Sequence, residues 1–165
     1  MRSPRTVVFF DMDETLLHSS DRPLLGPDVH RFRADGVTYW TTVRPDAERV
    51  LAAAREMFDD VYLFTAAEEP YAHAALDVTG LRGYFDGVYT ADTPRRDLPD
   101  VSDARWALID DHEGIASWKL HDLGLRPAQF DAHWQPIRAY RGGRSDDYAL
   151  PEALMLAFER ANRQE

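Results

Sequence analysis

The fold of this chain depends on one stretch near its start, Val7-Val8-Phe9-Phe10-Asp11-Met12-Asp13-Glu14-Thr15. A run of four apolar residues ends there at two aspartates separated by a single position. Valine and phenylalanine favour strands, and an unbroken apolar run is typical of a strand buried on both faces of a parallel sheet. Open α/β sheets bind ligands at the carboxyl ends of such strands, where Asp11 and Asp13 could attack or bind a metal and transfer a proton. Taken in isolation, the motif is equally compatible with a strand that ends in a solvated acidic turn.

The rest of the chain alternates between strand and helix patterns. Short apolar runs predict strands at residues 6–10, 61–64, 88–89, 106–109 and 137–140. Apolar residues at helical spacing predict helices at residues 46–58, from Glu68 to a stop at Gly80, at residues 114–122 and at residues 150–161. The alternation indicates an α/β fold with a mainly parallel sheet flanked by helices.

The segment between the first strand and the first helix carries a hairpin signal. Asp35-Gly36 lies between β-prone flanks in residues 32–40, which favours a two-residue turn. About thirty residues separate the aspartates from the helix, too few for an independent cap domain. We therefore expect a small β insertion after the first strand, no large cap, and a single domain over residues 1–165.

Composition excludes several classes of site. The chain has 165 residues, 44% of them apolar, and a formal charge of −10 that disfavours nucleic-acid backbones and anionic membranes as partners. It contains no cysteine, which rules out disulfides, thiolate metal sites and cysteine nucleophiles. Because neither a signal-peptide pattern nor a segment of membrane-spanning length is present, we expect a cytoplasmic protein.

Three of the expected strands end in side chains that carry oxygen. These are Asp11 and Asp13, then Thr65, then Asp110 and Asp111. In a parallel sheet with right-handed crossovers, all of these positions lie at one edge. Neighbouring carboxylates repel one another strongly at low dielectric, and a divalent cation relieves that repulsion. Oxygen ligands without a thiol point to Mg²⁺.

With these motifs in order, the sequence resembles the haloacid dehalogenase superfamily, which has a Rossmann-like sheet, and in particular its small C-terminal-domain phosphatase, or NLI-interacting-factor-like, group. The motifs that carry the resemblance are Asp-x-Asp-x-Thr at residues 11–15, a strand that ends in threonine at Leu63-Phe64-Thr65, and acids after a strand at Leu108-Ile109-Asp110-Asp111. The hairpin and the tail from Tyr140 through Asp146-Asp147 are also similar, so that the resemblance covers nearly the whole chain.

The third motif departs from the family pattern. The group has a lysine in a Lys-Asp-Leu context, and the matching stretch here is Arg95-Arg96-Asp97-Leu98. Arg96 takes the place of the lysine, and its guanidinium could hold two phosphate oxygens, although a plain surface arginine is an equal alternative. Lys119, the only lysine, follows the fourth motif and is expected to be a poor replacement. A second departure is His112, where the group more often has a small residue.

The resemblance implies Mg²⁺-dependent hydrolysis of phosphomonoesters. Asp11 would attack phosphorus and form an aspartyl-phosphate, while Asp13 would act first as an acid and then as a base. Thr65 and Arg96 would bind the phosphoryl oxygens. The metal ligands implied are Asp11, Asp13 through its main-chain carbonyl, Asp110 and Asp111. Two alternatives stay open, since Asp111 could be an outer or surface acid and Thr65 could simply cap a helix.

The missing cap and the resemblance both indicate a bulky substrate, phosphoserine or phosphothreonine in a protein. One alternative is a phosphatase of a small phosphometabolite or nucleotide. Another is a non-catalytic phosphate-binding or scaffold module, in which the altered third motif reflects lost activity. The hairpin residues Phe32, Tyr39 and Trp40 either line a substrate groove or pack in the ordinary way.

Overall fold

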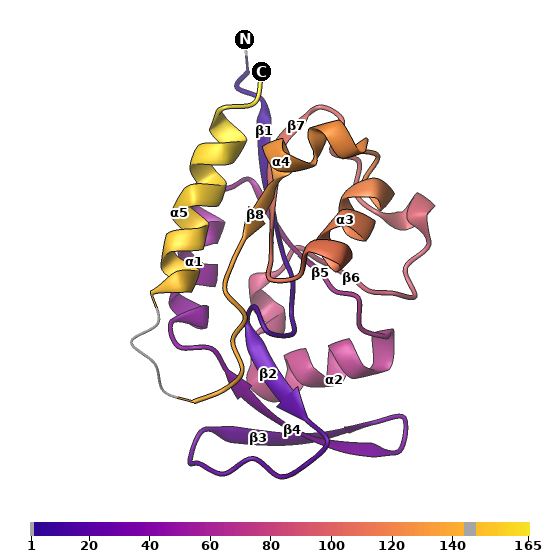
Figure 1. The fold of residues 1–165 in the computed structure, drawn as a ribbon, viewed down its shortest axis with the longest axis vertical. Helices are drawn as coiled ribbons and strands as arrows, with labels where there is room; N and C mark the ends of the chain where they lie inside the picture. Colours follow the sequence, from indigo (N-terminus) through magenta and orange to yellow (C-terminus); the bar gives the residue numbers. More distant parts are fainter. Residues whose placement is uncertain (1, 144–147) are drawn as a thin grey trace.

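A five-stranded parallel sheet forms the centre of the computed structural model, which describes residues 2–143 and 148–165 (Figure 1). The strand order is β6-β5-β1-β7-β8. The strands are β1 (Arg5–Phe10), β5 (Asp60–Phe64), β6 (Gly87–Tyr89), β7 (Ala104–Asp110) and β8 (Trp134–Pro136). The first strand is thus central, as its unbroken apolar run predicts, because a central strand is covered on both faces.

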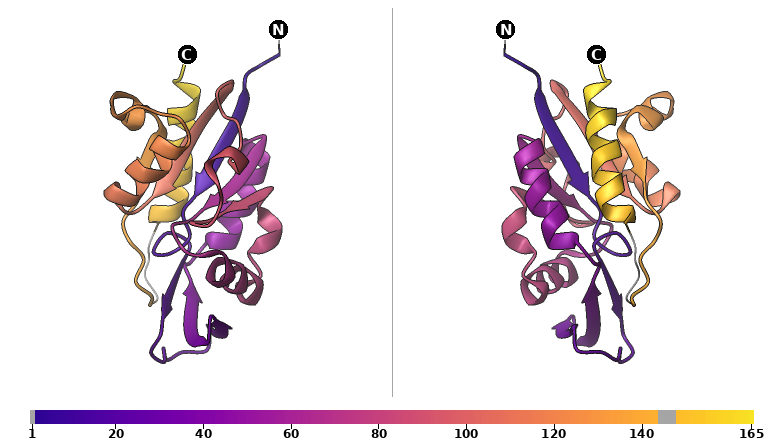
Figure 2. Two further views of the ribbon diagram at one scale, coloured as in Figure 1. Left: turned by 90° about the vertical axis from the view of Figure 1, so that its right-hand side faces the viewer. Right: turned by 90° about the vertical axis from the view of Figure 1, so that its left-hand side faces the viewer.

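Alternate residues of β1 supply the cores on the two faces of the sheet. Val8 and Phe10 pack into one core with helices α1 (Ala47–Met57) and α5 (Ala149–Asn162), which lie side by side in Figure 2. Val7 and Phe9 pack into the other core with α3 (Glu113–Asp122). The remaining helical segments are η1 (Arg82–Tyr84), η2 (Arg95–Asp97), η3 (Pro127–Gln129) and α4 (Phe130–His133).

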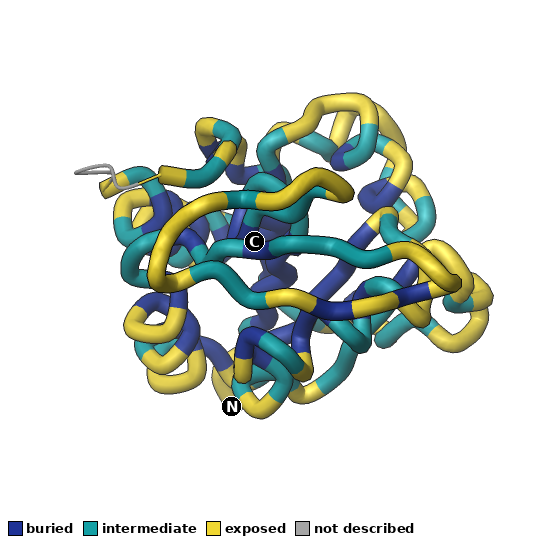
Figure 3. Tube along the Cα trace, turned by 90° about the horizontal axis from the view of Figure 1, so that it is seen from below, coloured by how far each residue is buried: buried dark blue, intermediate teal, exposed yellow. Residues whose placement is uncertain are grey.

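The predicted β insertion is a three-stranded antiparallel sheet at one end of the molecule. Its strands are β2 (Leu17–Ser20), β3 (Val29–Ala34) and β4 (Val37–Val43), in the order β2-β4-β3. Asp35 and Gly36 form the hairpin turn with φ of 49° and 77°, the left-handed values that a two-residue turn of this kind needs. Helix α2 (Glu69–Thr79) packs against β3, and most residues of the small sheet are exposed or only partly buried (Figure 3).

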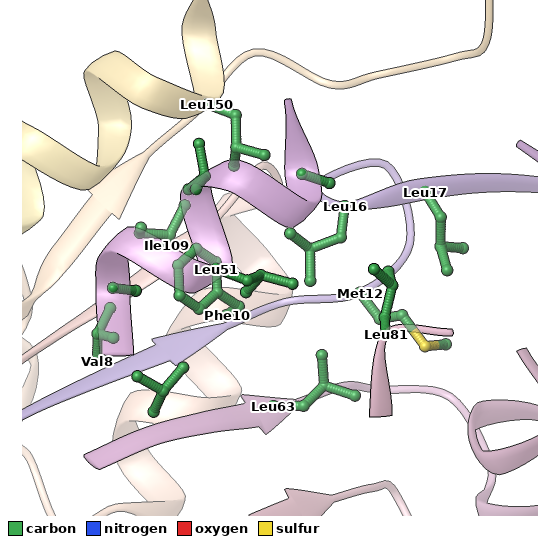
Figure 4. Close-up of a cluster of buried hydrophobic side chains, with 14 of the residues drawn as sticks. Val8, Phe10, Met12, Leu16, Leu17, Leu51, Leu63, Leu81, Ile109 and Leu150 are labelled. Carbon is green, nitrogen blue, oxygen red and sulfur yellow. The ribbon is translucent and has the colours of Figure 1, made fainter. Parts of the chain in front are cut away.

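Met12 anchors the turn between the two aspartates. Its side chain is fully buried and lies in the same core as Phe10, Leu16 and Leu81 (Figure 4). Since Met12 is held in the core, the loop that follows β1 has a defined course. This loop carries the first motif out of the sheet and into the small sheet.

Two strand expectations need correction. Residues 137–140 are not a strand, because the last strand of the sheet is β8, three residues earlier, where Trp134 pairs with Leu108. The chain then leaves the sheet, and the Tyr140 amide donates to the Glu14 carbonyl at 2.6 Å. Conversely, β2 is a strand that the polar sequence Leu17-His18-Ser19-Ser20 did not predict, and its pairing with β4 creates it.

The other predicted elements are confirmed to within a few residues, including the stop of α2 at Gly80, whose φ is 73°. Residues 144–147, which include Asp146 and Asp147 of the similar tail, lie outside the described residues. No helix in the described part of the chain is both long and apolar enough to cross a membrane.

Candidate active site

The carboxyl ends of β1, β5 and β7 carry the predicted site residues at one edge of the sheet. Phe10 pairs with Leu63 on one side and with Ile109 on the other. The residues that follow these three positions therefore lie at nearly the same height along the strand direction. Asp11, Thr65 and Asp110 are 6%, 1% and 0% exposed. Polar groups at this depth need partners, because burial without hydrogen bonds is costly.

Each carboxylate oxygen of Asp11 accepts a hydrogen bond from a neighbouring side chain. The hydroxyl of Thr15 donates to Oδ2 at 3.0 Å, and the ammonium of Lys119 donates to Oδ1 at 2.8 Å. Lys119 also donates to Oδ2 of Asp110 at 2.6 Å, while the other oxygen of Asp110 accepts from the His112 amide at 3.0 Å. One ammonium therefore joins the aspartate that ends the first strand to the aspartate that ends β7.

Lys119, which its place in the sequence predicts to be a poor replacement for the family's lysine, lies beside Asp11 and Asp110 in the structure. Helix α3 folds back against the sheet, and Lys119 lies on its buried side with Ala116 and Leu120. The Lys119 side chain is 0% exposed. Burial alone would lower the pKa of Lys119, but the carboxylates of Asp11 and Asp110 outweigh it and raise the pKa above its ordinary value.

Arg96 is not brought to this cluster by any contact among the described residues. It lies on η2, is exposed, and has no hydrogen bond or ion pair within residues 2–143 and 148–165. Its neighbour Arg95 donates to the carbonyl of His121 on α3. Arg96 as a phosphate ligand stays a prediction from the sequence.

Asp111 completes a group of three carboxylates that could hold a metal ion. Asp11, Asp110 and Asp111 each offer one oxygen, and these three oxygens lie within 4.8 Å of one another. Burial raises the pKa of Asp111 to about 7, and a hydrogen bond with Asp11 and the charges of Asp11 and Asp110 add to the effect. Three close carboxylates with a single ammonium retain excess negative charge, so this all-oxygen donor set fits a hard divalent cation such as Mg²⁺.

The Asp13 carboxylate has different neighbours from those of Asp11. Its Oδ1 accepts a hydrogen bond from the Tyr71 hydroxyl at 2.8 Å, and it is not one of the three clustered carboxylates. Burial raises the pKa of Asp13 to about 6, although the Tyr71 hydrogen bond acts in the opposite direction. Two aspartates separated by one residue thus have distinct environments, which is the arrangement that divides acid/base roles between carboxyl groups.

Thr65 and His112 both serve the backbone of the turns in which they lie. The Thr65 hydroxyl accepts from the Ala67 amide at 3.1 Å in the turn after β5, and since the N-cap of α2 is Glu68, Thr65 does not cap the helix that follows. His112 accepts from the Ile115 amide at 3.2 Å at the start of α3. This cap accounts for the histidine at a position where the resembling group more often has a small residue.

The sequence reasoning missed the contacts of Lys119 with Asp11 and of Tyr71 with Asp13. A signal for Lys119 was present, because the chain's only lysine lies on the apolar stripe of a predicted helix, where a charge needs partners. Tyr71 carried no comparable signal, since a tyrosine on the apolar face of a helix is usually a core residue.

Comparison with known proteins identifies similar chains. A family model described as NLI interacting factor-like phosphatase matches residues 6–95. The CTD small phosphatase-like protein 1 of Caenorhabditis elegans is 36% identical over 88 residues, which are 52% of this chain and 18% of that protein. The human carboxy-terminal domain RNA polymerase II polypeptide A small phosphatase 1 is 32% identical over 151 residues, covering 73% of this chain and 58% of that protein. The chain thus spans only part of the length of the curated relatives it matches.

Solved structures share the fold. The structure of Fcp1, an essential RNA polymerase II CTD phosphatase, superposes with a TM-score of 0.61 at 19% identity over 94% of this chain and 51% of that chain. A fission yeast Fcp1 bound to beryllium fluoride has the same TM-score at 20% identity, covering 96% and 50% of the two chains. These similarities confirm the predicted mainly parallel sheet flanked by helices.

Proposed function

Because the chain belongs to the NLI interacting factor-like phosphatase family, whose model matches residues 6–95, we propose that it is a Mg²⁺-dependent hydrolase of phosphomonoesters. The observation that carries this proposal is that the two aspartates of the first motif have different hydrogen-bond partners. Asp11 contacts Thr15 and Lys119 beside two further carboxylates, whereas Asp13 contacts Tyr71. One carboxylate is therefore suited to attack and the other to transfer a proton.

In the proposed reaction, Asp11 attacks phosphorus and forms an aspartyl-phosphate. Asp13, whose pKa of about 6 allows it to carry a proton near neutral pH, protonates the leaving oxygen. Asp13 then takes a proton from the water that attacks the aspartyl-phosphate, which releases phosphate and restores Asp11. Mg²⁺ held by Asp11, Asp110, Asp111 and the carbonyl of Asp13 would supply positive charge that lets the anionic carboxylate approach an anionic phosphate.

Lys119 is our candidate for the cation that the family places in its third motif. Its ammonium lies 2.8 Å from Oδ1 of Asp11 and is shielded from water, where a charge acts strongly on its neighbours. It can orient the nucleophile and offset the negative charge of the phosphoryl group. Thr65, with the backbone amides near it, and Arg96 remain the proposed further contacts to phosphoryl oxygens.

The proposed substrate is a phosphoserine or phosphothreonine side chain of a protein. Two observations support this class. The insertion after β1 is only a three-stranded sheet, which leaves the site without a large cap, and similar proteins are named as phosphatases of the C-terminal domain of RNA polymerase II. A small phosphometabolite is the competing substrate.

The test is an assay of the purified chain on an aryl phosphate with Mg²⁺ and with a chelator, beside Asp11→Asn. We expect turnover that needs both Mg²⁺ and Asp11, and an acid-quenched reaction in which the peptide that contains Asp11 gains the mass of one phosphoryl group. Turnover that Asp11→Asn retains would refute the nucleophile. Panels of phosphopeptides and phosphometabolites then decide the substrate class by kcat/KM.

A further inference from the structure

A single tyrosine connects the small sheet to the proposed acid. The hydroxyl of Tyr71, from the first turn of α2, donates to Oδ1 of Asp13 at 2.8 Å. Its ring contacts Tyr39 of β4 with 5.0 Å between centroids and Phe32 of β3 with 5.5 Å, both nearly edge to face. Phe32 and Tyr39 stack on each other at 5.3 Å. Three aromatic rings from three elements therefore hold one hydroxyl against one carboxylate.

The hydrogen bond occupies only one oxygen of Asp13. In the part of the chain that the structure describes, Oδ2 of Asp13 has no hydrogen-bond partner. A carboxyl group that is tied through one oxygen cannot rotate freely, and its other oxygen keeps a fixed direction. That second oxygen is the one available to protonate a leaving group.

On the basis of the proposed function, we infer that Tyr71 is a positioning residue that aims Asp13 at the leaving oxygen, and that the small sheet, through Phe32 and Tyr39, keeps Tyr71 in place. The contacts that support this are the 2.8 Å hydrogen bond and the ring packing around it. Loss of this orientation of Asp13 should slow the reaction, since a displacement of about 1 Å in a catalytic group reduces rates by roughly 10²-fold.

This role determines which phosphate esters the site can cleave. When the phosphorus–oxygen bond breaks, the electron pair goes to the leaving oxygen, which takes the proton from Asp13. A serine or threonine oxygen is a poor leaving group and needs that proton, whereas a nitrophenolate is stable without it. Tyr71 thus favours the alkyl phosphates of protein side chains over activated aryl phosphates.

The test compares leaving groups in variants that keep the ring packing. Tyr71→Phe removes only the oxygen that contacts Asp13, and Tyr84→Phe removes a tyrosine hydroxyl from η1 as the matched control. For each protein, kcat/KM is measured with Mg²⁺ on p-nitrophenyl phosphate, on aryl phosphates with progressively poorer leaving groups, and on a phosphoserine peptide. This parameter covers the steps through cleavage of the ester and excludes hydrolysis of the aspartyl-phosphate.

We expect Tyr71→Phe to lower kcat/KM by about 10- to 100-fold on the phosphoserine peptide and by less than about threefold on p-nitrophenyl phosphate, because general-acid catalysis contributes roughly 10²–10⁴-fold where the leaving group needs it. Tyr39→Leu, which loosens the ring cluster, should also lose more kcat/KM on the phosphoserine peptide than on p-nitrophenyl phosphate, but both losses should be smaller. Tyr84→Phe should match the wild type. Thermal melts of each variant are recorded alongside.

Equal losses on all esters, or no loss on any, would overturn the inference while leaving the proposed function intact. A wild-type protein that hydrolyses no ester in the presence of Mg²⁺ would overturn the proposed function and the inference with it. If Tyr71→Phe melts below the assay temperature, the dependence of Tyr39→Leu on the leaving group decides the question.

Discussion

Replacement of Lys119 by methionine removes one buried charge and little volume. The ammonium of Lys119 is the shared partner of Asp11 at 2.8 Å and of Asp110 at 2.6 Å, and the Lys119 side chain is 0% exposed. Methionine keeps the apolar stem and helix propensity of the side chain. The substitution therefore tests the charge of Lys119 with little disturbance of packing.

Both stability and catalysis should fall in Lys119→Met. Removal of one partner from a buried ion pair costs about 3–5 kcal/mol, because the remaining charge is left without compensation. For a chain of this size, each 1 kcal/mol lowers Tm by roughly 2–4 °C, so the Tm of the metal-free protein should fall by roughly 6–20 °C. Because Mg²⁺ would replace the missing positive charge among the same carboxylates, it should raise the Tm of the variant more than that of the wild type.

The assay pairs Lys119→Met with Arg96→Met, since these residues are the two candidates for the cation of the third motif. Thermal melts are recorded with a chelator and with Mg²⁺, and kcat/KM is measured below both melting transitions. We expect Lys119→Met to lose at least about 10²-fold in kcat/KM, as is typical when a transition-state charge partner is removed. Arg96→Met should change the free energy of unfolding by no more than about 0.5 kcal/mol, as is usual for an exposed substitution.

Two outcomes would refute this reasoning. If Lys119→Met has the same Tm as the wild type in the presence of chelator, the buried ion pair contributes nothing to the stability of the fold. If Arg96→Met loses more activity than Lys119→Met, the cation of the third motif lies on η2, as the order of the motifs in the sequence predicts, and the lysine of α3 is only structural.

Three further predictions concern the carboxylates and the hairpin. The pKa of Asp111 is raised from 3.8 to about 7, so between these pH values the folded metal-free protein binds more protons than the unfolded chain. The free energy of unfolding should therefore fall as pH rises through that window. In thermal melts from acid to neutral pH, Asp111→Asn should show a weaker dependence of Tm on pH. Protons and Mg²⁺ compete for the same oxygens, so calorimetry should find weaker Mg²⁺ binding below about pH 7, and a constant affinity would contradict a site at Asp111. Gly36→Ala should destabilise by about 1 kcal/mol in denaturant unfolding, because φ is 77° there, whereas Gly83→Ala, at an open site without a left-handed φ, should be neutral.

Local patterns were sufficient to predict the large sheet and the hairpin. The apolar run before Asp11 has the composition of a strand covered on both faces, and Asp35-Gly36 has the backbone freedom that a two-residue turn needs. These features depend on residues that are close in the sequence. Asp11, Asp110 and Asp111 could likewise be assigned to one edge of the sheet from the sequence alone, because the carboxyl ends of parallel strands share that edge.

Strand pairing over long range was harder to predict. Ile137 to Tyr140 has a composition suitable for a strand, but the register of β8 with Leu108 places the pairing three residues earlier. The polar segment Leu17–Ser20 becomes a strand because β4 lies beside it. Strand propensity largely reflects the neighbours that a segment finds in the folded state, and a single sequence does not specify those neighbours.

For the two aspartates, too, the sequence predicts one part of the site and the tertiary structure decides the rest. The sequence predicts a pair of carboxylates at the end of a buried strand and a hydroxyl and further acids near them. It does not predict which side chains contact each carboxylate, because Lys119 and Tyr71 reach Asp11 and Asp13 from helices whose direction depends on packing against the sheet. Contacts between residues far apart in the chain, 108 positions for Lys119 and Asp11, form only when the tertiary fold brings the elements together.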